Sequence, residues 1–292
     1  MARPIQFRDE FEEPQVIAAQ VKTTSTSRIR QIVQTFRRDP RWWFGVVLLL
    51  FVLAAIFAPQ ISPYDPLAYH PTITAQPPTW SHLLGTDTLG RDQLSRVIYG
   101  TRISLSVGLV SILLGGLSGT LLGMLAAYFT SWVDQLVTIV VDALLAFPSL
   151  ILALAIVASL GPSLINVSIA LAIVRIPVYA RLARGQTLQV TGQDYVLAAH
   201  STGTRTTKIL ARHILPNIFS PLLVQATISI SFAILDESVL SFLGLGTQPP
   251  TPEWGSMITD AQTALLGNDP WMMLGPALAI VLVLLSLNLF GD

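Results

Sequence analysis

Six long segments of this 292-residue chain consist almost entirely of apolar residues. A helix needs roughly 20 such residues to cross the hydrocarbon core of a bilayer. Inside lipid every backbone polar group must find a partner, and these runs are too continuous for the alternating strands of a barrel. We therefore predict an all-α membrane protein with six transmembrane helices. They cover about 42–58, 103–127, 135–160, 164–182, 218–243 and 271–290.

The composition supports a membrane protein. Charged residues make up 12% of the chain and hydrophobic residues 52%, with a mean hydropathy of +0.61, whereas a soluble domain carries about 25% charged residues. Disordered chains are poor in apolar residues, so disorder is excluded as well. The chain has no cysteine, which excludes disulfides and thiolate metal sites.

The zero net charge hides an uneven distribution. Residues 1–41 hold eight basic and five acidic groups, residues 175–213 hold six and one, and residues 214–292 hold none and six. Because excess Lys and Arg marks cytoplasmic segments, we expect a cytoplasmic N-terminal tail over 1–41 and a cytoplasmic loop over 183–217.

Six crossings then place the C-terminus in the cytoplasm as well. The segments 59–101 and 244–270 are expected outside, with a five-helix core over 102–292. Arg91, Arg96 and Arg102 run against this assignment, but the loop at 183–217 is the stronger signal.

Both outer segments are rich in proline, which fixes φ and blocks helix continuation. We expect rigid turns at the membrane rim, with Trp80, Trp254 and Trp271 in the interfacial belt. They could be plain connectors, but their length and rigidity favour a docking surface for an external protein. The candidate docking residues are Trp80, Pro249, Pro250, Glu253 and Trp254.

Small residues repeat every four positions along the second predicted helix. They are Ser111, Gly115, Gly119, Gly123 and Ala127. Such a face lets two membrane helices approach closely. We expect helix packing at Gly115, Gly119 and Gly123, with a neighbour either in this chain or in another.

Four charged residues fall within or near the predicted spans, where charge is costly. They are Asp142, Arg175, Asp236 and Glu237. A structural ion pair, such as Asp142 with Arg175, is the simpler interpretation. An ion relay needs a chain of such groups, and Asp142 stands alone on its helix.

The chain lacks the motifs of common enzymes. It has no His-Glu-x-x-His sequence, no Gly-x-Ser-x-Gly elbow and no zinc-ligand spacing among its four histidines. Neither of its two lysines follows a glycine, so no Walker loop is present. We expect no catalytic residue, no metal site and no nucleic-acid partner; any ATP hydrolysis must occur on another chain.

The predicted cytoplasmic loop has the pattern of two short helices. Helix-forming residues around Ala198 and Ala199 precede Gly203, which can adopt the left-handed conformation that ends a helix. Pro216 interrupts the chain before the fifth span. A helix–glycine–helix element outside the membrane could transmit movement between a soluble partner and the helices.

This loop resembles the "EAA" loop of permease subunits of ABC importers. Ala198-Ala199-x-x-x-Gly203 followed by Leu215-Pro216 carries the likeness, although Leu197 replaces the usual glutamate and His213 the usual isoleucine. The segments 82–96, 233–255 and 288–292 are similar to the C-type permease of dipeptide, oligopeptide and nickel importers. The likeness covers nearly all of residues 30–292.

The resemblance implies the type I importer permease fold in a bacterial or archaeal cytoplasmic membrane. It implies a B-type permease partner, one or two ATPase subunits that bind ATP and Mg, and an extracytoplasmic substrate-binding protein. The residues implied in ATPase coupling are Asp194, Tyr195, Ala198, Ala199, Gly203, Thr204, Arg205, Leu215 and Pro216. The family usually continues past Gly291-Asp292 with a basic tail, so we expect either that this chain was cut or that its end is not covered.

Peptides are the expected cargo. Nickel, glutathione and other small solutes stay open, because specificity in this family lies largely in the binding protein. An ion-driven carrier is a distant alternative, since such carriers need midplane ion ligands. A scaffold without transport is a third possibility, but it would not need the fixed Gly and Pro of the loop.

Overall fold

The computed structural model describes residues 41–129, 131–265 and 269–291. The chain divides into two units, residues 1–43 and 44–292, and the predicted tail over 1–41 lies outside the described residues except for Arg41. The described part consists of helices and connecting turns, with one isolated bridge between Thr86 and Asp92. The predicted all-α class is confirmed.

Five helical segments are long and apolar enough to cross a membrane. Four are the single helices α3, α4, α7 and α12, and the fifth is the stretch Thr206–Phe242, which ends in α10. Their bounds are Arg41–Ile61 for α3, Gln93–Phe129 for α4, Leu164–Thr191 for α7, Leu215–Phe242 for α10 and Trp271–Gly291 for α12.

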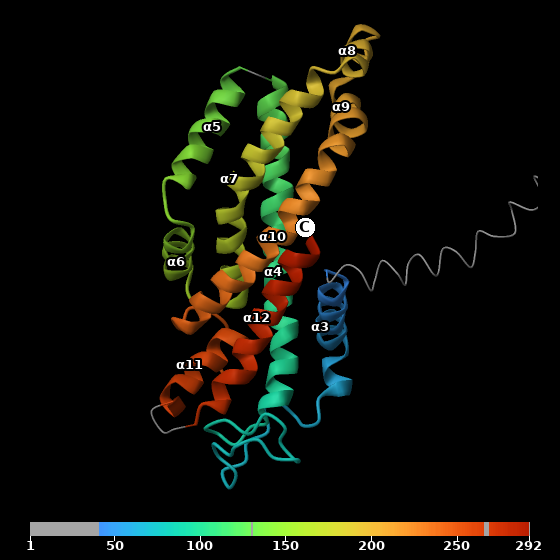
Figure 1. Ribbon diagram of the computed structural model, residues 1–292. Coiled ribbons are helices and arrows are strands. Elements are labelled where there is room, and N and C mark those ends of the chain that lie inside the picture. Colours follow the sequence, from blue (N-terminus) through green and yellow to red (C-terminus); the bar gives the residue numbers. More distant parts are fainter. Residues whose placement is uncertain (1–40, 130, 266–268, 292) are drawn as a thin grey trace, which may run out of the picture. The chain divides into compact units, whose positions relative to one another are not determined.

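The centre of the fold is the pair α4 and α7, which lie side by side (Figure 1). A Cβ atom added to Gly115, Gly119 or Gly123 would lie 2.4, 2.4 or 2.2 Å from a carbonyl oxygen of α7. The small-residue face of α4 therefore packs against α7 of the same chain. The three carbonyls belong to Ala172, Ile176 and Ala180. Residue numbers thus increase in the same direction along the contact on both helices, so α4 and α7 are parallel.

The predicted third span, 135–160, is not one helix. It divides into α5 (Trp132–Leu145) and α6 (Ser149–Leu160), which are bent by 92° at the break. Pro148 explains the break, because its ring disfavours the helical conformation of Phe147 before it. The hydrophobic pattern alone does not reveal this, since both halves are apolar.

The bent pair nevertheless completes a crossing. Because α4 and α7 are parallel, the chain must return along the whole shared length between Phe129 and Leu164. The hydroxyl oxygen of Ser111 lies 3.2 Å from the carbonyl oxygen of Ser168, which fixes the level at which α7 begins. The part of α4 between this level and its last residue is about 30 Å long, at 1.5 Å per residue. This length equals the thickness of the hydrocarbon core of a bilayer.

The segment after α10 contains a helix that was not predicted, α11 (Trp254–Leu265). Trp254 at its start is fully buried, and its indole nitrogen donates to the carbonyl of Val97 on α4 at 3.1 Å. Phe51 of α3 meets the same ring edge-on at 6.0 Å between centroids. The prediction that Trp254 lies in the interfacial belt is therefore wrong, because its side chain is packed inside the chain.

Two predicted helices are also longer than expected. α4 begins at Gln93, well before residue 103, and α7 continues nine residues past 182 to Thr191. The polar residues of these extensions stopped the apolar pattern but not the helices. Asp92 accepts hydrogen bonds from the backbone N–H and hydroxyl of Ser95 at 2.8 and 2.7 Å and so caps α4.

Candidate functional site

The loop between α7 and α10 folds into two short helices. α8 covers Asp194–Ser201 and α9 covers Thr206–Ile209. Gly203 between them has φ +73°, and the N–H of Thr204 donates to the carbonyl of Ala199 at 3.1 Å. These features end α8 with a left-handed residue. No atom lies within 4 Å of a Cβ placed on Gly203, so backbone conformation, not packing, calls for glycine.

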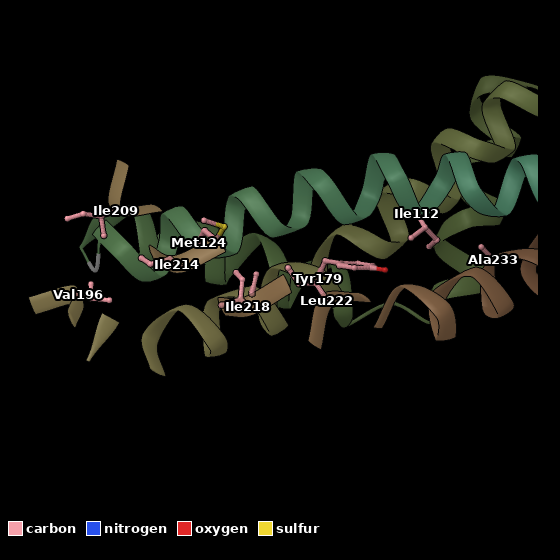
Figure 2. Packing of buried hydrophobic residues seen from close by; sticks show 10 residues of the cluster. Ile112, Met124, Tyr179, Val196, Ile209, Ile214, Ile218, Leu222 and Ala233 are labelled. Carbon is pink, nitrogen blue, oxygen red and sulfur yellow. The ribbon is translucent and has the colours of Figure 1, made fainter. Parts of the chain in front are cut away.

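The two short helices are anchored to the long ones by apolar side chains. Val196 of α8 and Ile209 of α9 are buried in one cluster with Met124 of α4. Figure 2 shows these side chains near Ile214 and Ile218, which belong to the chain entering α10. The two short helices therefore pack against both α4 and α10.

A polar contact adds to this anchor. The Tyr128 hydroxyl lies 3.1 Å from Nε2 of His200, and the two rings stack with centroids 6.2 Å apart. The same hydroxyl lies 3.4 Å from the hydroxyl of Thr206 on α9. Tyr128 was not among the predicted site residues, and its one signal in the sequence is a polar hydroxyl at the end of an otherwise apolar helix.

The predicted coupling residues form the outward face of this element. The residues of this set that are exposed to solvent are Asp194, Tyr195, Ala198, Gly203, Arg205, Leu215 and Pro216. Ala199 and Thr204 are half-buried. Tyr195 also lies near His213, with ring centroids 6.2 Å apart. The structure thus brings residues 194–205 onto one protruding element, while Leu215 and Pro216 sit at its base.

The connection from α9 into α10 is unusual. Residues Leu210–Ile214 form one π-helical turn, which ends two residues before Pro216. Pro216 has no N–H to donate to the preceding turn. The side-chain amide of Asn217 donates to the carbonyl of His213 at 2.6 Å. π-Turns often mark functional sites in helices, and this one joins the protruding element to α10.

The charged groups of the spans pair differently from the sequence prediction. Arg175 does not meet Asp142 but forms an ion pair with Asp236 of α10. Asp142 pairs instead with Arg181 at 2.7 Å. The α7 residues Arg175 and Arg181 are six positions apart, so they lie on different faces of the helix.

A further pair joins α5 to α7. The Arg184 guanidinium donates two hydrogen bonds to Asp134, at 2.6 and 2.7 Å. The side chains of Asp142 and Arg181 are more than half exposed, whereas those of Arg175 and Asp236 are mostly buried.

The predicted docking residues fall into two groups. Trp80 is 98% exposed, and Pro249 and Pro250 are exposed as well. Glu253 and Trp254 have no exposed surface. A docking role for these two side chains does not fit their burial, and their contacts are internal to the chain.

Two of the arginines that opposed the charge rule are also internal. Arg91 and Arg96 are buried beside Asp87, with closest N–O distances of 2.5 and 3.5 Å. Asp260 of α11 lies 3.5 Å from Arg91; burial raises the pKa of its carboxyl, and Arg96 and Arg91 oppose that rise. These two arginines are therefore paired with acidic groups inside the chain and add no free positive charge to their segment.

The described residues contain no group of three or more His, Cys, Asp or Glu side chains placed to hold a metal ion. The part of the chain that stands out for interaction is the exposed, anchored element over 194–205.

Comparison with known proteins gives two family matches. Residues 119–292 match the model of the binding-protein-dependent transport system inner membrane component. Residues 27–78 match the N-terminal transmembrane domain of oligopeptide transport permease C.

Individual relatives cover most of the chain. A dipeptide transport system permease of Alkalihalophilus pseudofirmus is 39% identical, over 96% of this chain and 92% of its own length. A di/tripeptide permease of Pseudomonas aeruginosa is 44% identical over 91% and 90%. A glutathione transport system permease of Pectobacterium atrosepticum is 43% identical over 85% and 82%.

The matched family model covers more than half of the chain, and its fold is the helical permease fold described above. The chain is therefore a multi-pass membrane protein of the binding-protein-dependent transport system inner membrane component family, with the type I ABC permease fold.

Proposed function

We propose that this chain is one half of the translocation pathway of an ATP-driven peptide importer. A B-type permease subunit forms the other half. One or two ATPase subunits bind ATP and Mg on the cytoplasmic side, and a substrate-binding protein delivers cargo from outside. The chain itself carries no catalytic residue in this proposal.

The observation that carries this proposal is the element over residues 194–205. It is exposed along one face, yet Val196 and Ile209 fix it to α4 and α10. A partner that pushes on the exposed face therefore moves two membrane helices. This is the arrangement that a coupling element for an ATPase requires, and Asp194, Tyr195, Ala198, Gly203 and Arg205 are its contact residues.

The orientation follows from the charge distribution. We place the element over 194–205, the N-terminus and the C-terminus in the cytoplasm, because excess Lys and Arg marks that side. The internal pairing of Arg91 and Arg96 supports this orientation. The outer segments, with exposed Trp80, Pro249 and Pro250, then face the binding protein.

Peptides are the cargo that the relatives favour. Two of the three relatives named above are permeases for dipeptides or di- and tripeptides, and the third is for glutathione, itself a small peptide-like solute. Glutathione, nickel or another small solute is the alternative. Uptake of a radiolabelled dipeptide by cells that express the complete importer tests the substrate, with labelled glutathione as the competing arm.

The coupling role is tested at Gly203. We predict that Gly203→Asp abolishes ATP-dependent uptake and uncouples the ATPase, while the chain still inserts and assembles. A charge at the tip would meet the docking surface, and no atom of this chain crowds the position. Reconstituted importer in proteoliposomes gives both uptake and ATPase rates.

Gly244→Asp is the matched control. Gly244 has φ +81° and equally open surroundings. It follows the C-terminal end of α10, whereas the element with Gly203 precedes the N-terminal end of that helix. It carries the same backbone strain and the same new charge. Normal coupling in Gly203→Asp, or equal loss of ATPase coupling in both variants, contradicts the assignment.

A further inference from the structure

Two carboxyl groups meet in the interior near the outer end of the bundle. Glu237 of α10 is 1% exposed and Glu253, just before α11, is fully buried. The backbone holds them together: a Cβ on Gly255 would lie 2.3 Å from the carbonyl oxygen of Ser238. Trp254 fixes the same turn to α4 through its bond to Val97. Three elements therefore enclose the two carboxyls.

The two carboxyls have different partners. Glu253 accepts hydrogen bonds from the backbone N–H groups of Gly255 and Ser256 at 2.5 and 2.9 Å. It thus caps the first turn of α11, where a negative charge is favourable. Glu237 neighbours Glu253 and the hydroxyls of Ser104 and Ser238, but neither of its oxygens makes a hydrogen bond of good geometry.

The serines around these carboxyls behave unlike others in the helices. Ser111, Ser118 and Ser286 each donate to the carbonyl four residues earlier, at 2.6 Å. The hydroxyls of Ser104, Ser238 and Ser241 are buried and make no such bond. Ser104 and Ser238 neighbour Glu237, and Ser241 neighbours Glu253. Buried hydroxyls that do not bond to their own helix therefore gather around the carboxyl pair.

No positive side chain neutralises this pair within the described part of the chain. Asp236, next in sequence, faces Arg175 of α7. Arg91 and Arg96 of the outer segment face Asp87 and Asp260. α12 contains no charged residue or histidine, and neither do residues 44–61 of α3. Two adjacent carboxyl groups in an apolar interior cannot both be ionised unless a cation lies between them. Without a cation, one of the two must hold a proton.

We propose that Glu237 and Glu253 share one proton, which Glu237 carries and donates to the carboxylate of Glu253. This site joins α10 to the first turn of α11. Burial raises the pKa of the Glu253 carboxyl, which is consistent with a retained proton. A metal ion fits less well, because it takes roughly six oxygen ligands and both oxygens of Glu253 already accept backbone N–H groups.

Infrared difference spectroscopy of the full chain in lipid tests the proposal. A protonated carboxyl has a C=O stretching band distinct from that of a carboxylate, and the band shifts in D2O. We expect this band at pH 7 in the native chain and its loss in Glu237→Gln, whose amide can donate to Glu253 in the same way. Asp65→Asn is the control, because Asp65 is exposed and its removal should leave the band unchanged.

Stability gives an independent readout. The proton is bound in the folded chain and lost as the pH rises, so the native unfolding temperature should shift downward between pH 7 and pH 9. The Glu237→Gln shift should be smaller. A native chain without the band at pH 7, or a band unchanged in Glu237→Gln, overturns the proposal. So does an unfolding temperature that rises with Na⁺ against choline at constant ionic strength, because a cation then holds the site.

Discussion

At the scale of single residues, the charges within the spans show how partner choice depends on the helix face. Arg175 and Asp236 are mostly buried and join α7 to α10, whereas Asp142 and Arg181 are more than half exposed. Breaking a buried pair leaves an uncompensated charge in a poorly hydrated place. Breaking the exposed pair leaves a charge that this chain itself does not bury.

We therefore predict that Arg175→Leu destabilises the chain by about 3–5 kcal/mol, the usual cost of removing one partner of a buried pair. Arg175→Leu with Asp236→Leu should recover much of that loss. Denaturant unfolding in detergent micelles measures both variants.

The matched control is the exposed pair. Arg181→Leu should destabilise the chain less than Arg175→Leu does, because both side chains of its pair are more than half exposed. Equal losses at Arg175 and Arg181 contradict the distinction between the two pairs.

The sequence identified these charged residues as exceptional but not their partners. Asp142, Arg175, Asp236 and Glu237 are conspicuous because charge is rare in apolar helices. Their pairing depends on how α5, α7 and α10 are rotated and on the break at Pro148, which no local pattern specifies. For the same reason the burial of Glu253 and Trp254 could not be predicted. The sequence of a Pro-rich loop predicts exposure, and only the packing of Trp254 at the start of α11 against α4 shows that these residues are buried.

At the scale of helices, the close contact between α4 and α7 depends on glycines, because a glycine has no side chain to hold the two backbones apart. The repeat at Gly115, Gly119 and Gly123 was visible in the sequence, but the neighbouring helix was not. The partner carbonyls of α7 follow the same four-residue spacing. Backbone thus lies against backbone over three successive turns.

We predict that Gly119→Ala destabilises the chain by about 1–3 kcal/mol, as overpacking of a close contact does. Its new Cβ would lie 2.4 Å from the rigid carbonyl oxygen of Ile176 and 2.8 Å from Cβ of Tyr179. The unfolding temperature of the purified chain is the measurement.

Gly185→Ala is the control on the partner helix. Nothing lies within 4 Å of its new Cβ, and alanine favours a helix over glycine by about 1 kcal/mol. This variant should be neutral or slightly stabilised. A tolerated Gly119→Ala shows instead that the two helices can move apart without cost.

At the scale of the whole molecule, α4 and α7 determine the topology. Because they are parallel, α5 and α6 must together return the chain to the end where α7 begins, despite the bend between them. Gly45 of α3 lies against Phe290 near the end of α12. α3 thus begins at the same end of the bundle at which α12 finishes.

Cysteine labelling can test the orientation without background, because the chain has no cysteine. We predict that Thr207→Cys reacts with an impermeant thiol reagent only from the cytoplasm and Gln248→Cys only from outside. Both positions are exposed. The reversed pattern contradicts the orientation inferred from charge.

The bent pair makes the sharpest topological prediction. Ser131 precedes α5 and Ser159 lies in the last turn of α6, and both are exposed. If the pair is one crossing, Ser131→Cys reacts only from the cytoplasm and Ser159→Cys only from outside. A re-entrant loop would leave both on one side, but then α7 would have to run antiparallel to α4. Labelling of both cysteines from the same side would therefore contradict the parallel glycine contact as well as the six crossings.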